Sequence, residues 1–345
     1  GVPQGACRIQ FWRTESEYGE NPDNPFGAVN DEVTSGSKSI NVRPLVEPTA
    51  TATATPTITP TATATYAGPP MVSIQAGAFE MGSTTDVYEE PVHSVTLNAF
   101  KMSGYEVTNS DYVIFLNSEG NKTEGGIAWL TVVSNQYQGI TGGSGAGTFS
   151  VVPGYENRPV VYVSWYGAVA YCNWLSNLHG LTPCYGPAGN RGSDPSVWRT
   201  LNGYRLPTEA EREYAVRAGD MAEYYWGEPF PPFPPNIGNY AWYNGNSGGN
   251  HHDVGQKLPN AFGLYDMSGN VWEWCSDWYS DSNINPPAYY GISPESNPAG
   301  PSSGTARVVR GGCWDFDHVS CRSADRGAIN PNSSSNILGF RIVRN

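Results

Sequence analysis

Residues 49–65 read TATATATPTITPTATAT, with threonine at every odd position and only alanine, proline or isoleucine between. In an extended chain alternate side chains share one face, so this period places all the threonines on one side. Such a composition is typical of Pro/Thr-rich spacers on secreted proteins. We therefore predict an extended spacer over residues 49–68, in which the candidates for O-glycosylation are Thr49, Thr51, Thr53, Thr55, Thr57, Thr59, Thr61, Thr63 and Thr65.

A second interpretation of the spacer uses its two faces. One face would carry sugar while the apolar face packs against protein. Seventeen extended residues span about 55 Å, which is longer than a small domain is wide. Such a segment could run along a neighbouring copy of the chain, and this predicts self-assembly into a filament or surface layer.

The charge balance limits the class of partner. The chain has 19 Lys and Arg against 32 Asp and Glu, a net charge of −13. Nucleic-acid phosphates and anionic lipid surfaces repel so acidic a protein, which excludes nucleic acid as a partner. Only 15% of the residues are charged, against about 25% in an average domain, and this is typical of an extracellular or cell-surface protein.

Two further features bear on localisation. The chain starts at Gly1 without a hydrophobic leader, which we interpret as the result of signal-peptide removal. No apolar run approaches the roughly 18 residues that a transmembrane segment needs.

Residues 1–48 contain two short strand candidates, at residues 7–12 and 40–46, within a stretch rich in Gly, Asn, Pro and Ser. This N-terminal arm is too short to bury a core alone. Two interpretations stay open. The arm is either an extension packed on its own domain or an assembly arm that adds a strand to a neighbour's sheet edge.

Beyond Pro69 the sequence is typical of a packed domain, residues 69–345, with short strands, Gly and Asn turns and three helices. One helix follows Thr108 and a second follows the N-cap candidate Ser164. The third opens at Thr208, which has capping-box spacing to Glu211. The first two helices carry aromatic residues at helical spacing, which we predict to be core contacts: Tyr112, Phe115, Tyr171 and Trp174.

Eight motifs of this domain, in order, resemble those of the formylglycine-generating-enzyme domain, also called the sulfatase-modifying-factor domain. They are FEMG at 79–82, EPVH at 90–93, YEVTN at 105–109, PVVYVSW at 159–165, YRLPTEAE at 204–211, GLYDMSGNVWEW at 263–274, RGG at 310–312 and GFR at 339–341. The resemblance implies an α+β fold, a loop-rich variant of the C-type lectin fold. Function must still be argued from the site.

The resemblance implies a copper site only where the family's catalytic cysteines are present. In the family's enzymes, two cysteines shortly after a Gly-Gly-Ser motif bind copper, and thiolates suit Cu(I). Here the first of these positions aligns with Phe316, and nothing matches the second, because Cys321 resembles a downstream structural cysteine. Cys313 and Cys321 could form a substitute site, but a disulfide or separate structural roles suit them better. We therefore predict no copper and no catalysis.

Calcium is the cofactor that the resemblance favours. In the family, oxygen atoms around the Gly-Asn-x-Trp-Glu turn bind Ca²⁺, and the matching positions here are Asp266, Gly269, Val271 and Glu273. Two carboxylates and two backbone carbonyls suit a hard cation. In the alternative, the two carboxylates only hydrogen-bond a tight loop.

The segment from Cys313 to Asn336 is rich in Asp, Asn, Ser and aromatic residues. It resembles the variable terminal segment of retroelement-diversified proteins, which use this fold for ligand display. Aromatic anchors with short polar neighbours make adaptable binding surfaces, so a glycan or protein ligand would contact Trp314, Phe316, Asp317 and His318. The alternative is a family-typical loop without a partner.

Six cysteines allow 15 pairings. Cys172 and Cys184 flank a helix end and its turn, which predicts a local disulfide. The resemblance implies that Cys275 pairs with Cys321, since both are common in bacterial members of the family. The two remaining cysteines depart from the family pattern, and we interpret them as partners: Cys7 in the arm and Cys313 after the Gly-Gly pair.

These observations predict an exported, non-catalytic protein that assembles into filaments or a surface layer through residues 1–68 and displays a lectin-like domain. A monomeric surface ligand-binding protein with a variable C-terminal segment is the first alternative. A copper-dependent formylglycine-generating oxidase is the second.

Overall fold

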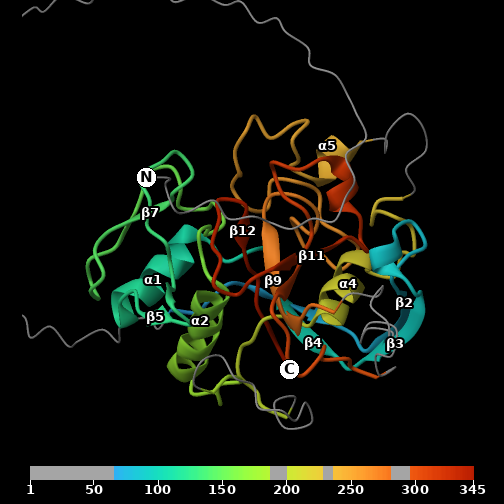
Figure 1. Ribbon diagram of the computed structural model, residues 1–345, viewed down its shortest axis with the longest axis horizontal. Coiled ribbons are helices and arrows are strands. Elements are labelled where there is room, and N and C mark those ends of the chain that lie inside the picture. Colours follow the sequence, from blue (N-terminus) through green and yellow to red (C-terminus); the bar gives the residue numbers. More distant parts are fainter. Residues whose placement is uncertain (1–65, 187–199, 228–235, 281–295) are drawn as a thin grey trace, which may run out of the picture. The chain divides into compact units, whose positions relative to one another are not determined.

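The computed structural model describes residues 66–186, 200–227, 236–280 and 296–345. The predicted arm (1–48), nearly all of the predicted spacer (49–68) and Cys7 lie outside these ranges. The described chain consists of short strands, few helices and long connections (Figure 1), which confirms the loop-rich α+β class. None of the described helices is long and apolar enough to cross a membrane.

The largest sheet of the described chain has four strands in the order β11-β10-β9-β12. Strand β10 runs antiparallel to both of its neighbours, whereas β12 pairs with β9 in parallel. The side chains of Trp272 and Trp274 on β9 are both completely buried. Indole groups at the sheet centre account for much of the core, because each buries a large apolar area. The four strands are β9 (Trp272–Trp278), β10 (Arg307–Arg310), β11 (Arg326–Ile329) and β12 (Leu338–Gly339).

The two ends of the domain meet in a second sheet, of order β1-β4-β13. Strand β4 pairs antiparallel with β1 and also with β13 near the C-terminus. A separate hairpin joins β2 and β3, and two further two-stranded pairs, β5 with β6 and β7 with β8, extend from the loops. The bounds are β1 (Met71–Ile74), β2 (Gly77–Met81), β3 (His93–Leu97), β4 (Phe100–Ser103), β5 (Thr123–Glu124), β6 (Ile127–Ala128), β7 (Ile140–Thr141), β8 (Ser150–Val151) and β13 (Val343–Arg344).

The three predicted helices are confirmed. α1 (Asn109–Glu119) starts after Thr108, α2 (Trp165–Leu178) starts after Ser164, and α4 (Glu209–Arg217) starts after Thr208. Each N-cap side chain accepts a hydrogen bond from a backbone N–H in the first turn, and α4 has the expected capping box with Glu211. Such caps satisfy backbone donors that the helix itself leaves open. The structure adds the short α5 (Ile237–Tyr240) and the 3₁₀ turns η1 (Val87–Glu89) and η4 (His318–Cys321).

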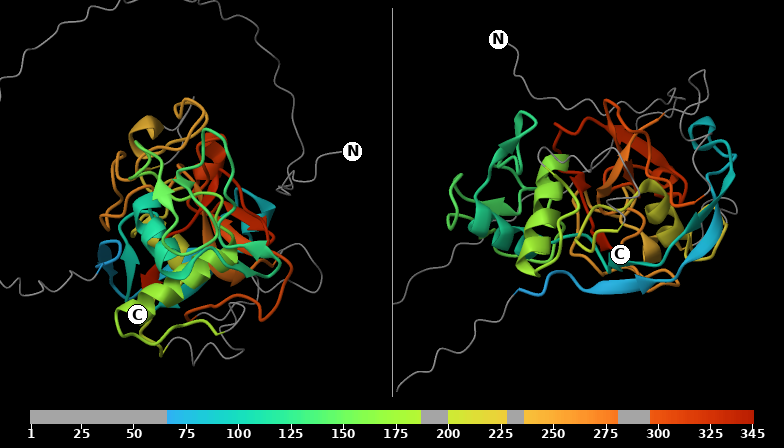
Figure 2. Two further views of the ribbon diagram at one scale, coloured as in Figure 1. Left: turned by 90° about the vertical axis from the view of Figure 1, so that its left-hand side faces the viewer. Right: turned by 90° about the horizontal axis from the view of Figure 1, so that it is seen from below.

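The aromatic stripes of α1 and α2 pack against each other. Tyr112, Phe115 and Tyr171 are core residues as predicted, whereas Trp174 is half-buried. The rings of Tyr112 and Tyr171 are stacked with centroids 5.8 Å apart, and both touch the ring of Phe340. Figures 1 and 2 show these two helices at one end of the domain and the β2–β3 hairpin at the other. The large sheet and α4 lie between them.

Candidate ligand-binding surface and the turn beneath it

The candidate surface begins where β10 ends in two glycines. Gly312 has φ +75°, and a Cβ there would lie 2.5 Å from the carbonyl oxygen of Ser320. Only glycine tolerates both that backbone conformation and so close an approach. The Gly-Gly turn therefore folds the segment from Cys313 back onto η4.

Trp314 lies beneath the surface and is only 3% exposed. Its indole N–H donates to the carbonyl of Asn336 at 3.2 Å, and its ring stacks on Tyr137 with centroids 5.2 Å apart. A side chain held in this way supports the surface from below. Its position does not suit the direct ligand contact that we predicted for it.

The other three predicted contact residues lie together on the outside. Asp317 is exposed and caps η4, because its Oδ1 accepts from the backbone N–H of Val319 at 3.0 Å. Phe316 and His318 flank it and are half-buried. The ring of His318 approaches Tyr243, with centroids 6.5 Å apart. Sequence reasoning missed Tyr243, since it comes from a turn with no periodic pattern.

The two thiols near this surface are buried. Burial raises the pKa of Cys313, and the carboxylate of Asp315 adds to the shift. Burial also raises the pKa of Cys321 well above its usual value, with further contributions from Cys313 and from acidic neighbours. A thiol whose pKa is raised stays protonated and is a poor nucleophile and metal ligand. The electrostatics of this region therefore oppose thiolate chemistry.

No disulfide joins the five cysteines within the described ranges, and all five are buried. The charge of Cys184 contributes to the raised pKa of Cys172, so these two predicted partners are neighbours. Cys313 likewise contributes to the raised pKa of Cys321, so these two thiols are also neighbours. The groups that affect the pKa of Cys275 are Asp277, Glu209, Arg310 and Arg212, and Cys321 is not among them. The structure therefore brings together the first predicted pair but gives no support to Cys275–Cys321, and the Cys7–Cys313 pair involves a residue outside the described chain.

The predicted calcium turn lies directly under the Gly-Gly turn. The backbone N–H of Gly269 donates to the carbonyl of Gly311 at 2.7 Å. Gly269 has φ +78°, and a Cβ there would lie 2.2 Å from the carbonyl of Trp242. Both turns therefore depend on glycine, and each fixes the position of the other.

Glu273, the last of the four predicted calcium ligands, is wholly buried and forms ion pairs with two arginines. Arg212 donates to its carboxylate through Nε at 2.8 Å and Nη2 at 3.1 Å. Arg341 donates to the same two oxygens at 2.7 and 2.8 Å. Burial acts to raise the pKa of Glu273, but these two guanidinium charges lower it below the usual value.

The same two arginines also donate hydrogen bonds to backbone carbonyl oxygens of this turn. Arg212 Nη2 donates to the carbonyl of Met267 at 2.8 Å, and Arg341 Nη2 donates to that of Tyr265 at 2.9 Å. Asp266 points elsewhere, because its Oδ2 accepts from the backbone N–H of Gly255 at 2.6 Å. A calcium ion that used Glu273 would have to face two cationic groups already bound there. Glu273 therefore offers no open oxygen to a hard cation in this arrangement, which removes one of the two carboxylates from the predicted calcium set.

A buried pair of carboxyl groups remains beside this turn. Asp266 Oδ1 and Glu106 Oε2 are buried and accept no hydrogen bond from the described residues. Burial and the neighbouring Asp266 raise the pKa of Glu106 well above its usual value. Burial likewise raises the pKa of Asp266 to about 6. Loss of hydration disfavours the charged form of each group.

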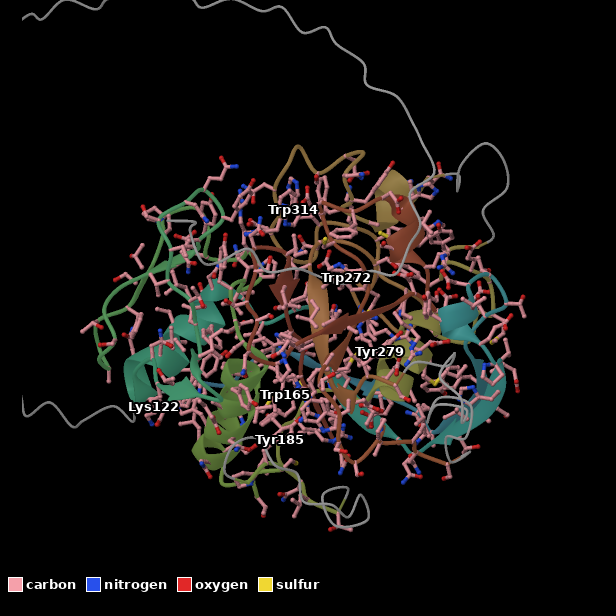
Figure 3. All side chains as sticks on the ribbon, in the orientation of Figure 1. Lys122, Trp165, Tyr185, Trp272, Tyr279 and Trp314 are labelled. Carbon is pink, nitrogen blue, oxygen red and sulfur yellow. The ribbon has the colours of Figure 1, made fainter. Side chains whose placement is uncertain are left out.

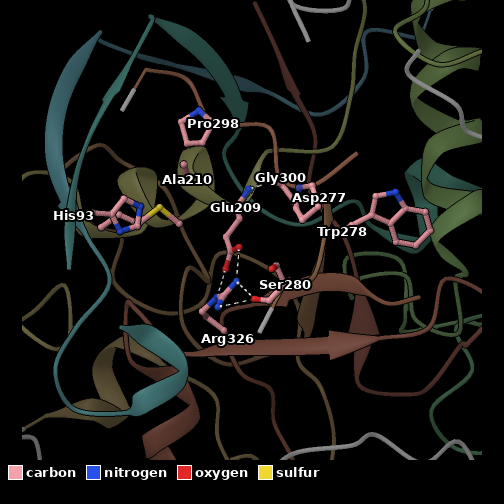
Figure 4. A pocket seen from close by; sticks show the side chains of 11 residues that line it. His93, Glu209, Ala210, Asp277, Trp278, Ser280, Pro298, Gly300 and Arg326 are labelled. Carbon is pink, nitrogen blue, oxygen red and sulfur yellow. Dashed lines mark hydrogen bonds and ion pairs between the residues drawn. The ribbon is translucent and has the colours of Figure 1, made fainter. Parts of the chain in front are cut away.

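A small pocket of about 20 Å³ lies between α4 and the end of β9 (Figure 4). The side chains of Glu209 and Arg326 meet there in a two-point ion pair, at 2.5 and 2.9 Å. Arg326 also donates to the carbonyl of Tyr88 at 2.9 Å. These contacts occupy the charges of Glu209 and Arg326, and the carboxylate of Asp277 accepts from the backbone N–H of Glu209 at 3.1 Å. The pocket therefore offers little to a ligand.

Comparisons with known proteins match nearly the whole of the described domain. The model of the sulfatase-modifying factor enzyme 1-like domain matches residues 56–345. The formylglycine-generating enzyme of Streptomyces coelicolor is 33% identical over 309 residues, which cover 79% of this chain and 88% of that protein.

Two solved structures share the fold. Treponema denticola variable protein 1 is 30% identical with a TM-score of 0.58, covering 79% of this chain and 94% of that one. PvdO from Pseudomonas aeruginosa is 29% identical with a TM-score of 0.59, covering 80% and 94%. These likenesses confirm the α+β, lectin-like fold class predicted from the sequence.

Proposed function

Because the chain belongs to the family of sulfatase-modifying factor enzyme 1-like domains but has Phe316 where the family's enzymes have a catalytic cysteine, we propose that it is a non-catalytic, exported protein that binds a ligand at its C-terminal segment. The observation that carries the proposal is the outer face formed by Phe316, Asp317, His318 and Tyr243. We call these four residues the display face.

The chemistry of the region supports binding rather than oxidation. A phenyl ring at position 316 offers neither a nucleophile nor a metal ligand. The remaining thiols, Cys313 and Cys321, are buried and have raised pKa values. Copper-dependent oxidation of a cysteine requires thiolates that can hold Cu(I), and this site favours neutral thiols.

The composition of the display face supports recognition of a glycan or protein surface. It combines an exposed carboxylate with three aromatic rings, and η4 and Trp314 hold it from below. Aromatic anchors with short polar neighbours bind at low entropic cost when they are fixed in place. The similarity to a Treponema denticola protein whose name calls it variable favours this role.

Replacing both Asp317 and His318 with alanine tests the display face. The full-length protein and this double variant would be compared on an array of immobilised glycans and on cell-surface protein extracts. We expect discrete binding by the wild type and its loss in the variant, with a melting temperature lowered only slightly by the loss of the Asp317 cap on η4. Equal binding by both proteins would contradict the proposal.

Self-assembly is the second candidate function, and the strict threonine alternation of residues 49–65 favours it. We propose that residues 1–65 join copies of the chain into a filament or surface layer, with sugar on the threonine face. Electron micrographs and sedimentation of the full-length protein would be compared with those of a variant lacking residues 49–65. Fibres that disappear on deletion would support assembly, and a monodisperse wild-type monomer would contradict it.

A further inference from the structure

A groove of about 670 Å³ lies between α1, α2 and the chain that follows α2. It is far larger than the pocket beside α4 and falls in the range of small-ligand sites. Four aromatic side chains line it: Phe115, Trp129, Trp174 and Tyr185. Neither the family resemblance nor the display face uses this groove. Figure 3 shows one of its lining residues, Tyr185, near α2 at the helical end of the domain.

The floor of the groove is apolar and firmly packed. The rings of Phe115 and Trp129 are stacked at 5.2 Å, and the ring of Phe115 lies 5.6 Å from that of Trp174. Phe115 and Trp129 are buried, whereas Trp174 is half-buried and Leu178 is 39% exposed. Two apolar side chains are thus presented to solvent on a rigid support.

The rim of the groove is acidic. Glu119 at the end of α1 and Glu124 in β5 both line it, and no basic residue is among the described residues that do so. Glu124 also accepts from the indole N–H of Trp129 at 3.3 Å. This contact fixes the carboxylate beside the aromatic floor. An anionic ligand would be repelled here, and a cationic one attracted.

A neighbouring lysine shows how this corner accommodates a cation. The Nζ of Lys122 lies 2.8 Å from Glu119 and 5.2 Å from the ring centroid of Trp129. The lysine is 55% exposed and stands just outside the groove. One ammonium group is therefore already paired with a carboxylate and an aromatic face, and each of these contacts favours a cation.

We propose that the groove is a binding site for a basic peptide segment, in which lysine or arginine side chains alternate with apolar ones. The apolar side chains would pack on Trp174 and Leu178. The cationic side chains would reach Glu119 and Glu124. Lys122 already pairs with Glu119, but the carboxylate of Glu124 accepts, among the described residues, only from the indole N–H of Trp129. A neutral sugar would leave Glu124 without a matching charge, so the charge of the rim favours the peptide.

The test uses the full-length protein and a fluorescein-labelled, amidated peptide of sequence Leu-Lys-Leu-Lys-Leu. Fluorescence anisotropy would measure its affinity. We expect Trp174→Ala, and separately the double variant Glu119→Gln with Glu124→Gln, to weaken binding about tenfold. The peptide Leu-Glu-Leu-Glu-Leu and cellotetraose should not compete with the labelled peptide.

The net charge of −13 attracts any basic peptide, so matched controls are needed. Ile114→Ser removes a 40% exposed apolar side chain from α1 outside the groove, and Glu156→Gln removes an exposed carboxylate elsewhere. Both controls should bind as the wild type does. Binding that the groove variants leave unchanged, or that the controls reduce equally, would overturn the proposal, as would competition by cellotetraose.

Discussion

Arg212 of α4 and Glu273 of β9 form a two-point ion pair in which neither side chain is more than 1% exposed. Arg341 binds the same carboxylate from the C-terminal part of the chain. One buried glutamate thus connects the helix, the central sheet and the end of the domain. The turn beneath the display face is held by guanidinium groups at the position where the family resemblance predicted calcium.

Replacing Arg212 with methionine should destabilise the domain by about 2–3 kcal/mol, because the buried carboxylate of Glu273 loses one of its two guanidinium partners and keeps Arg341. The carbonyl of Met267 would also lose its donor. Urea unfolding followed by tryptophan fluorescence would measure the change. Lys122→Met is the matched control, since its ion pair with Glu119 is exposed and should contribute at most about 1 kcal/mol.

Chelation of calcium should leave the melting temperature unchanged. Both oxygens of Glu273 are already bound to arginine, and a ligand that does not bind the folded state cannot stabilise it. Thermal unfolding in EDTA and in excess calcium would measure this. A melting temperature that falls in EDTA and recovers with calcium would show instead that the turn holds the ion.

The buried carboxyl of Asp266 should make stability depend on pH. Its pKa is raised from 3.8 to about 6 on folding, so the folded state binds this proton more tightly than the unfolded state. The resulting stabilisation is complete below about pH 4 and is lost as the pH rises through 6. It amounts to roughly 2–3 kcal/mol.

Asp266→Asn isolates this effect. Asparagine tolerates the φ of +53° at this position and carries no charge, so the variant should be more stable than the wild type above pH 6 and similar to it near pH 4. The comparison with the variant is needed because His251 has the opposite pH dependence. Burial lowers the pKa of His251 to about 4, so protonation of this side chain destabilises the folded state as the pH falls. Parallel stability curves for the two proteins would contradict the assignment.

If the chain is exported as proposed, non-reducing peptide mapping should recover the neighbours Cys172 and Cys184 in one disulfide-linked fragment. The bond would close a loop of 13 residues, from 172 to 184, so its reduction should cost about 3 kcal/mol. Alkylation of either cysteine without prior reduction would contradict the pairing. The same map shows whether Cys313 is joined to Cys7, to Cys321 or to neither.

Features that depend on neighbouring residues could be predicted from the sequence. The caps at Thr108, Ser164 and Thr208 fix their helices through contacts within one turn, and each helix starts as predicted. Long-range contacts could not be predicted in this way. The burial of Trp314 depends on Tyr137, more than 170 residues earlier in the chain.

The site differed from expectation for the same reason. A Gly-Asn-x-Trp-Glu turn indicates oxygen ligands, but only the fold brings Arg212 within reach of Glu273 from 61 residues away. In the display face, Tyr243 joins His318 from a turn without a periodic pattern. Residue types predicted the chemistry of individual groups, whereas the partners of those groups depended on topology.

Incubation of the full-length protein with Cu(I), oxygen and a cysteine-containing sulfatase peptide, followed by mass spectrometry, tests the central claim most directly. The formylglycine-generating enzyme of Streptomyces coelicolor serves as the positive control. Because we align Phe316 with the position of the family's first catalytic cysteine, and because burial raises the pKa of Cys313 and Cys321, we predict that the peptide cysteine stays unchanged. Its conversion to formylglycine by this protein would contradict the account.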